Sequence, residues 1–296
     1  MDFQTLAQLV LPGLTTGCVY ALIALGFVLC FNVSGVVNMA QGEFVMLGGL
    51  LGAWLSIKGV PLIAAVVVAT MAGAVLGVLQ ERLTLAPVRR SPPFIQITIT
   101  LGVAVIVRGI ALIQFGKDPL SMPAFSGDDT FELLTAVLPI QTLWVWGATA
   151  AMLIGIYYFL RHTDVGRAVR ACSINVVAAR LMGVNAERLT VMVFAIAGGT
   201  GALAGAVITP VVLASWDAGF VYALKGFIGA ILGGLRSPVV AVMGGLGVGV
   251  AESLAAGYLS SGWKDAIVYG LLLAFLLIRG GVFLHGRAAL TAGGGH

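Results

Sequence analysis

The chain has 296 residues, of which 59% are hydrophobic and 9% are charged, with a formal net charge of +4. Soluble domains carry about 25% charged residues, so this composition excludes a globular protein with a fully solvated surface. We therefore expect residues 1–296 to form a single domain inside a lipid membrane, an all-α polytopic bundle of transmembrane helices.

Apolar runs near the length of about 20 residues that crosses a bilayer recur along the whole chain. They predict eight to nine spans, near residues 8–31, 36–57, 61–83, 94–115, 139–160, 188–213, 221–235, 239–258 and 264–284. The seventh is short for a full crossing. The first is expected to remain in the mature protein, because no basic region precedes it and no small-residue cleavage site follows it.

Glycine contributes 41 residues and often recurs at a spacing of four, which lets helices approach closely. The spacing occurs in Gly13/Gly17, Gly48/Gly52, Gly73/Gly77, Gly201/Gly205, Gly229/Gly233 and Gly245/Gly249. Gly-rich helix packing is the main expectation. An alternative for Gly233-Gly234 and Gly244-Gly245 is a helix break that lines a cavity.

The most polar helix start in the chain is that of the second predicted span. Asn38, Gln41 and Glu43 follow one another within six residues there. Polar groups at such a depth should face protein or water and not lipid. Two interpretations remain open, an inner gate or pathway lining and a hydrogen-bonded helix junction.

Two further charges lie well inside predicted spans. Arg108 is 14 residues after Phe94, and Glu252 is 13 residues after Val239. At 1.5 Å per residue both sit at about 20 Å from the same membrane surface. We therefore predict that Arg108 and Glu252 interact in the bundle interior, directly or through water, with two separate snorkelling or vestibule-facing groups as the alternative.

The distribution of charge between the loops predicts the orientation in the membrane. Arginines cluster between spans three and four and around residues 161–188, and cytoplasmic loops carry such an excess. The connection at 116–138 has one lysine and the acidic residues Asp118, Asp128, Asp129 and Glu132, so it is expected to be periplasmic. With nine crossings the N-terminus is periplasmic, and the C-terminus, with Arg279 and Arg287, is cytoplasmic.

Residues 161–188 form a hydrophilic excursion that is longer than a turn between two helices requires. Ser173 or Asn175 can cap a short amphipathic helix there, and Gly183 and Asn185 can end it. Its apolar side is predicted to consist of Val176, Ala179, Leu181 and Met182. The residues alone leave open whether this helix lies on the inner leaflet or binds a protein partner.

No catalytic or metal-binding pattern is present. Cys18, Cys30 and Cys172 are unclustered, which predicts a packing role, and the three histidines form no Ser/His/Asp or Cys/His constellation. The chain has no G-x-x-x-x-G-K-[ST] motif, so ATP must be hydrolysed elsewhere, if at all.

Several segments carry a resemblance to a known family. Ala178-Ala179 followed by Gly183 fits the A-A-x-x-x-G centre of the loop by which ABC importer permeases dock on their ATPase subunits, although Val177 replaces its usual Glu. GCVYALIALGFVLCFNVSGVVNMAQGEFVMLGG resembles the opening of LivH-type permeases of branched-chain amino acid ABC transporters, with Gln41 in place of a common His. Later signatures follow in order: GRAVRACSINVVAARLMGVN, KGFIGAILGGLRSPVVAVMGGLGVGVAESL and YLSSGWKDAIVYGLLLAFLLIR.

The resemblance implies a permease subunit in a bacterial inner membrane, with no enzyme activity and no cofactor of its own. It implies three kinds of partner besides lipid: a homologous second permease, two cytoplasmic ATPases that hold ATP and Mg, and a periplasmic binding protein, with no nucleic acid. It also implies that Asn175, Ala178, Ala179, Gly183 and Asn185 couple the permease to the ATPases. The expected function is translocation of branched-chain or related small amino acids, delivered by the binding protein, through alternating access. Urea, amides or small organic or aromatic acids are alternative substrates, and an ion-coupled carrier, a channel and a membrane enzyme are the competing classes.

Overall fold

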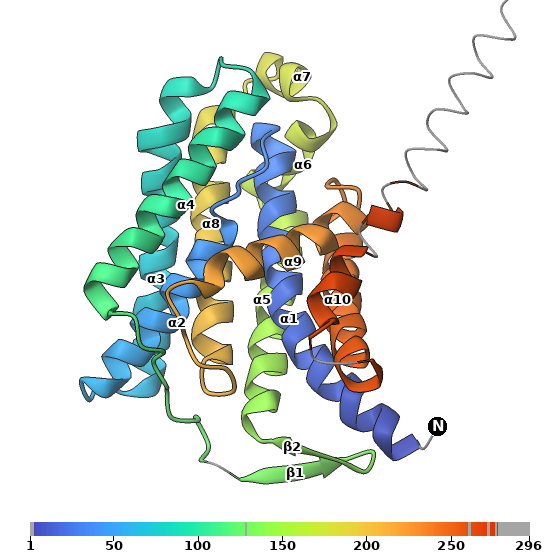
Figure 1. Cartoon of the computed structure of the whole chain (residues 1–296). Helices are drawn as coiled ribbons and strands as arrows, with labels where there is room; N and C mark the ends of the chain where they lie inside the picture. Colours follow the sequence, from blue (N-terminus) through green and yellow to red (C-terminus); the bar gives the residue numbers. More distant parts are fainter. Residues whose placement is uncertain (1–2, 128, 260–261, 271–272, 276, 278–296) are drawn as a thin grey trace, which may run out of the picture.

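The computed structural model describes residues 3–127, 129–259, 262–270, 273–275 and 277, which form a helical bundle with a small hairpin at one end (Figure 1). The helices are α1 Phe3–Ser34, α2 Gln41–Ile57, α3 Leu62–Gln80, α4 Pro93–Phe115, α5 Gln141–His162, α6 Asp164–Ile174, α7 Val176–Leu181, α8 Ala186–Ile208, α9 Ala218–Leu232 and α10 Pro238–Tyr258. A π-helical turn, Glu81–Leu85, and a 3-10 turn, Ala86–Val88, continue α3. The predicted all-α polytopic bundle is confirmed. The antiparallel hairpin of β1 Thr130–Leu133 and β2 Ala136–Pro139, inside the predicted loop 116–138, was not expected.

Among the described residues, six helices are long and apolar enough to cross a membrane: α1, α3 with its extension, α4, α5, α8 and α10. Two of the three remaining predicted spans correspond to α2 and α9, which have only 17 and 15 residues. Residues 264–270 are helical, as expected of the ninth span. Its end at 278–284, together with Asp128, Arg279 and Arg287, lies outside the described residues.

Helix α1 forms the centre of the bundle. Its residues from Gly17 to Cys30 are buried without interruption, and it packs against α8, α9 and α10. In Figure 1, α9 crosses obliquely in front of α1, whereas α8 and α10 run along it. Because this stretch of α1 meets protein on all sides, its apolar residues build the core and not the lipid-facing surface.

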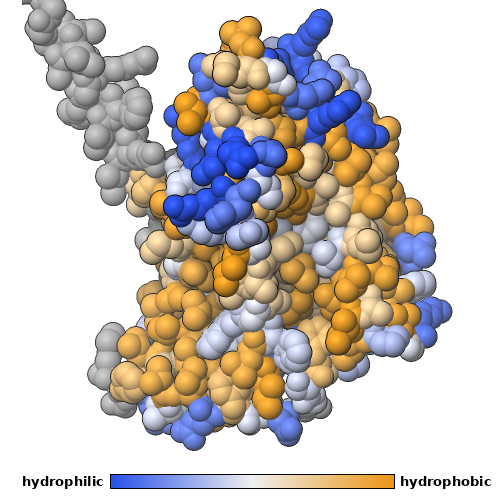
Figure 2. Space-filling model, turned by 180° about the vertical axis from the view of Figure 1, so that it is seen from behind, coloured by the Kyte–Doolittle hydropathy of each residue, from blue (hydrophilic) through white to orange (hydrophobic). Residues whose placement is uncertain are grey.

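The outer helices carry the apolar surface. Ile63 and Met71 on α3 and Ile106 and Ile113 on α4 are each more than 60% exposed. Figure 2 shows apolar residues over much of the middle of one face of the molecule, with hydrophilic residues gathered toward its two ends. This distribution suits a protein whose middle is surrounded by hydrocarbon.

Glycine packing is confirmed at the contact of α2 and α8. A Cβ added at Gly48 would lie within 3.0 Å of the Ala202 backbone, and one at Gly205 would meet the backbone at Val45 in the same way. The alternative of a helix break at Gly244-Gly245 is wrong, because α10 is continuous there and Gly245 packs on Ala21.

The three cysteines confirm the packing interpretation. Cys18, Cys30 and Cys172 are all free and buried. Burial raises the pKa of the Cys172 thiol on α6, and the nearby positive charge of Arg180 only partly opposes this effect. The thiol is therefore held in its neutral form as a packing group.

Candidate functional site

The predicted polar patch begins in a buried segment that is not helical. Residues 35–40 connect α1 to α2, and Asn38 within them is fully buried. The Asn38 Oδ1 accepts hydrogen bonds from Gln80 Nε2 at 2.6 Å and from the Ala40 amide at 3.2 Å, and the Met39 amide donates to Thr100 Oγ1 at 3.1 Å. Irregular backbone is tolerated at membrane depth only when protein satisfies its polar groups. Here the side chains of Thr100 and Asn38 satisfy the backbone amides of Met39 and Ala40.

Gln41, the first residue of α2, fills a contact between three helices. Its Nε2 donates to the carbonyl oxygen of Ala197 on α8 at 2.9 Å, and a Cβ at Gly26 on α1 would collide with its side-chain amide. Its Oε1 is buried and makes no hydrogen bond with any described residue. Such an unsatisfied acceptor is uncommon in a packed protein and draws attention to this position.

Glu43 lies two residues further along α2 and forms an ion pair across the bundle. Arg108 Nη2 on α4 is 2.5 Å from Glu43 Oε1, and its guanidinium carbon is 5.7 Å from the centre of the Phe220 ring. Glu43 Oε2 packs against Gly219 in the first turn of α9. Since the positive dipole ends of α2 and α9 both lie beside this carboxylate, they stabilise its charge together with Arg108.

Asn38, Gln41 and Glu43 are 0%, 0% and 1% exposed, so the structure places all three in a packed junction. This arrangement agrees with the helix-junction interpretation in the conformation seen here. A gate role stays a prediction. It is favoured by the buried Gln41 Oε1 and Glu43 Oε2, which both lack donors among the described residues.

The predicted pairing of Arg108 with Glu252 is wrong. Arg108 pairs with Glu43, whereas Glu252 Oε1 is 2.6 Å from Lys225 Nζ on α9, and its Oε2 accepts a hydrogen bond from Tyr20 at 2.7 Å. Depth along a helix gives no information about the face on which a side chain lies, and α4 and α10 turn their charges toward different neighbours. Lys225 is only 3% exposed and was missed, although a lysine within an apolar run opposite an intramembrane glutamate is a usable signal.

The excursion at 161–188 folds into α6 and α7. Asn175 accepts a hydrogen bond from the Ala178 amide at 3.0 Å and caps α7, and Asn185 caps α8 through the Arg188 amide at 3.1 Å. Ser173 instead donates to a carbonyl oxygen in α6. Gly183 ends the α7 turn with a φ of +87°, a conformation that favours glycine.

The predicted apolar side of α7 is partly wrong. Ala179 is buried and Val176 packs inward beside it, but Leu181 and Met182 are each 85% exposed. They lie near Val177, which is 69% exposed, while Ala178 is exposed as well. A six-residue helix can bury only one narrow stripe, so α7 carries a second apolar surface, formed by Val177, Leu181 and Met182, that points away from the bundle.

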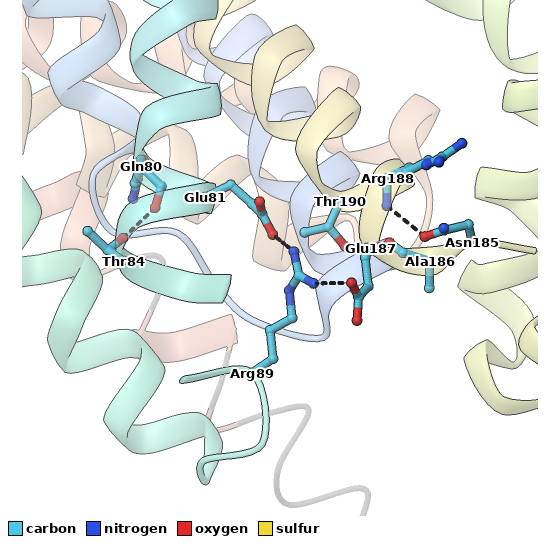
Figure 3. A network of polar contacts seen from close by, with 9 residues as sticks. All are labelled: Gln80, Glu81, Thr84, Arg89, Asn185, Ala186, Glu187, Arg188 and Thr190. Atoms are coloured by element: carbon cyan, nitrogen blue, oxygen red, sulfur yellow. Dashed lines mark hydrogen bonds and ion pairs between the residues drawn. The ribbon is translucent and has the colours of Figure 1, made fainter. Parts of the chain in front are cut away.

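An ion-pair bridge that sequence reasoning missed joins this region to the end of α3 (Figure 3). Arg89 pairs with the fully buried Glu81 in the π-helical turn and with Glu187 in the first turn of α8, at 3.2 Å. Glu187 follows the Asn185 cap by two residues. The bridge therefore connects the segment just after α7 to the connection between α3 and α4.

Residues 9–276 match the family described as branched-chain amino acid transport system / permease component. The chain is 30% identical over 297 residues to the high-affinity branched-chain amino acid transport system permease protein LivH of Salmonella typhimurium and 29% identical to BraD of Pseudomonas aeruginosa, with 94% of each chain covered. The ribose import permease protein RbsC of Escherichia coli is 28% identical over 63% of this chain and 56% of its own. PsaBC from Streptococcus pneumoniae in complex with Fab has a TM-score of 0.47 at 14% identity, covering 90% of this chain and 89% of that one.

Proposed function

The chain belongs to the family of branched-chain amino acid transport permeases, and from this premise we propose that it imports leucine, isoleucine, valine or related small amino acids. In this proposal it is one of two homologous membrane subunits. Two cytoplasmic ATPases bind ATP and Mg, and a periplasmic binding protein delivers the solute. The C-terminus and residues 161–188 are cytoplasmic, and the N-terminus and the β1–β2 hairpin are periplasmic.

The outward apolar surface of α7 carries this proposal. Val177, Leu181 and Met182 are presented to solvent at the end of a helix that is capped on both sides. Exposed apolar residues on a rigid protrusion are typical of a protein interface. An ATPase subunit is the partner that this position would serve, with Asn175, Ala178, Ala179, Gly183 and Asn185 fixing the shape of the contact.

The ion-pair bridge supplies a route for the motion. ATP binding would displace α7, the Asn185 cap would carry the displacement into α8, and Arg89 would pass it to the end of α3. Two other carboxylates, inside the membrane helices, argue against an ion-coupled carrier. Glu43 and Glu252 each have a cationic partner within 2.6 Å, so neither is a free acceptor for a proton or sodium ion.

The assembly test is copurification from the native membrane in mild detergent. We expect the parent chain to bring a second permease and the ATPases, and Leu181→Glu with Met182→Glu to lose the ATPases while keeping the second permease. Leu213→Glu, the same change at an exposed position beyond the far end of α8, is the control and should keep both. ATPases retained by the double variant would contradict the docking role of α7.

Cutting the ion-pair bridge should weaken the coupling between ATP hydrolysis and transport. Glu187→Gln removes the exposed half of the Arg89 bridge and leaves the buried Arg89–Glu81 pair intact, so the loss of stability should stay below about 1 kcal/mol. We expect the amount of solute transported per ATP hydrolysed in vesicles to fall, by up to about fivefold. Asp164→Asn removes another exposed loop carboxylate, the partner of Arg167, and should leave the ratio unchanged. Equal ratios in the two variants would remove the bridge from the mechanism.

A further inference from the structure

A large apolar groove opens on the side of the bundle, away from the polar junction. It has a volume of about 830 Å³ and lies between α1, α5, α6 and α10. Its floor is buried, as Leu25 and Leu29 on α1 show, whereas Ile154 on α5 and Met243 on α10 form walls that are each more than 65% exposed. The volume falls in the range of ligand pockets, about 300–1,000 Å³. An apolar hollow of this size requires an apolar occupant.

The rim at one end of the groove is basic. Arg161, Arg170 and Arg236 line it, together with the polar side chains of Asn32 and Ser173, and none of the described lining residues is acidic. Arg161 is held against Tyr157, to whose hydroxyl it donates a hydrogen bond. Arg170 and Arg236 form no ion pair with any described carboxylate, although Arg167, also on α6, is paired with Asp164. Two exposed guanidinium groups thus remain available for an anion.

We propose that this groove binds one anionic phospholipid. The acyl chains would lie along the apolar walls, and the phosphate would accept hydrogen bonds from Arg170 and Arg236, since guanidinium groups match phosphate geometry. Basic pockets between membrane helices on the cytoplasmic side bind anionic head groups by this combination of charge and apolar burial. This site rests on the cytoplasmic placement of residues 161–188 proposed above, but it concerns a lipid and is independent of which solute is transported.

The first experiment measures lipid binding by native mass spectrometry. The full chain, purified with its partner subunits, is stripped of lipid in detergent and titrated with phosphatidylglycerol or with phosphatidylcholine. We expect one tightly bound phosphatidylglycerol in the parent, and binding roughly tenfold or more weaker in Arg170→Gln with Arg236→Gln. Arg167→Gln, in the same helix but with its own carboxylate partner, should bind as the parent does.

Three outcomes would overturn the proposal. The first is equal affinity for the two lipids, and the second is equal affinity in the double variant and the Arg167→Gln control. The third is a protein occupant of the groove. It is tested in native membranes with a Met243→Cys variant to which a photo-crosslinker is attached. We expect crosslinks to lipid, whereas crosslinks to a second permease subunit would identify the groove as a protein interface. Because Arg170 and Arg236 are exposed, their replacement should leave the fold unchanged, and size-exclusion chromatography checks this.

Discussion

Replacing Gly205 by alanine is expected to destabilise the bundle strongly. The added Cβ would lie inside contact distance of the Val45 carbonyl oxygen and of the Gly49 amide, both in the backbone of α2. A backbone cannot move aside as a flexible side chain does, so the two helices would have to separate. We expect a cost of about 1–3 kcal/mol or more, typical of overpacking in a dense core. In a membrane this loss is serious, because helix association there depends on packing.

Gly102→Ala on α4 and Gly247→Ala on α10 are matched controls. Both glycines are helical, and a Cβ added at either would meet nothing within 4 Å. Alanine favours a helix over glycine by about 1 kcal/mol, so these variants should be neutral or slightly stabilised. The measurement is the melting temperature in detergent, followed by fluorescence-detected size-exclusion chromatography. A Gly205→Ala variant that melts with the controls would show that α2 and α8 are less tightly packed than described.

Features that depend only on residues close together in the sequence were predictable. Asn175 and Asn185 cap helices because their side chains reach an amide three residues on. Gly183 occupies a backbone conformation that other residues avoid. The apolar runs predicted the positions of nearly all the membrane helices, because a chain in lipid must form its backbone hydrogen bonds within each segment.

The start of α2 was not predictable in the same way. Val36 and Val37 continue the hydropathy of a membrane span, yet they belong to a connection that is not helical. This backbone is held by Thr100 on α4 and by Asn38, which itself pairs with Gln80 on α3. Hydropathy measures only the transfer to an apolar environment, and it cannot show that distant side chains replace the hydrogen bonds of a helix.

The partners of the buried charges were equally unpredictable from the sequence. Arg108 and Glu43 are 65 residues apart, and Lys225 and Glu252 are 27 apart. The length of a helix gives the depth of a charge, but only the packing of whole helices brings a particular pair together. Arg89 poses the same difficulty, because its partner Glu187 lies on α8, beyond two intervening membrane helices in the sequence.

Breaking the Glu43–Arg108 pair is also expected to destabilise the protein strongly. Arg108→Met leaves the buried Glu43 carboxylate without its cation, so we expect a loss of about 3–5 kcal/mol in stability. Glu43→Gln combined with Arg108→Met removes both charges, and most of this loss should be recovered, since a buried pair is worth little against neutral groups of similar size. The melting temperatures of the two single variants and the double variant complete the cycle. A double variant as unstable as Arg108→Met alone would contradict the charge argument.

Transport by the double variant then separates the two interpretations of the junction. If the pair only holds helices together, a variant that regains stability should also regain uptake of leucine into vesicles that contain the whole importer. If Glu43 belongs to a gate, its charge must find a different partner when α2 and α9 separate, and uptake should stay low although the protein is stable. We expect the second result, because Glu43 Oε2 is buried without a donor among the described residues, an arrangement that costs stability in the conformation seen here.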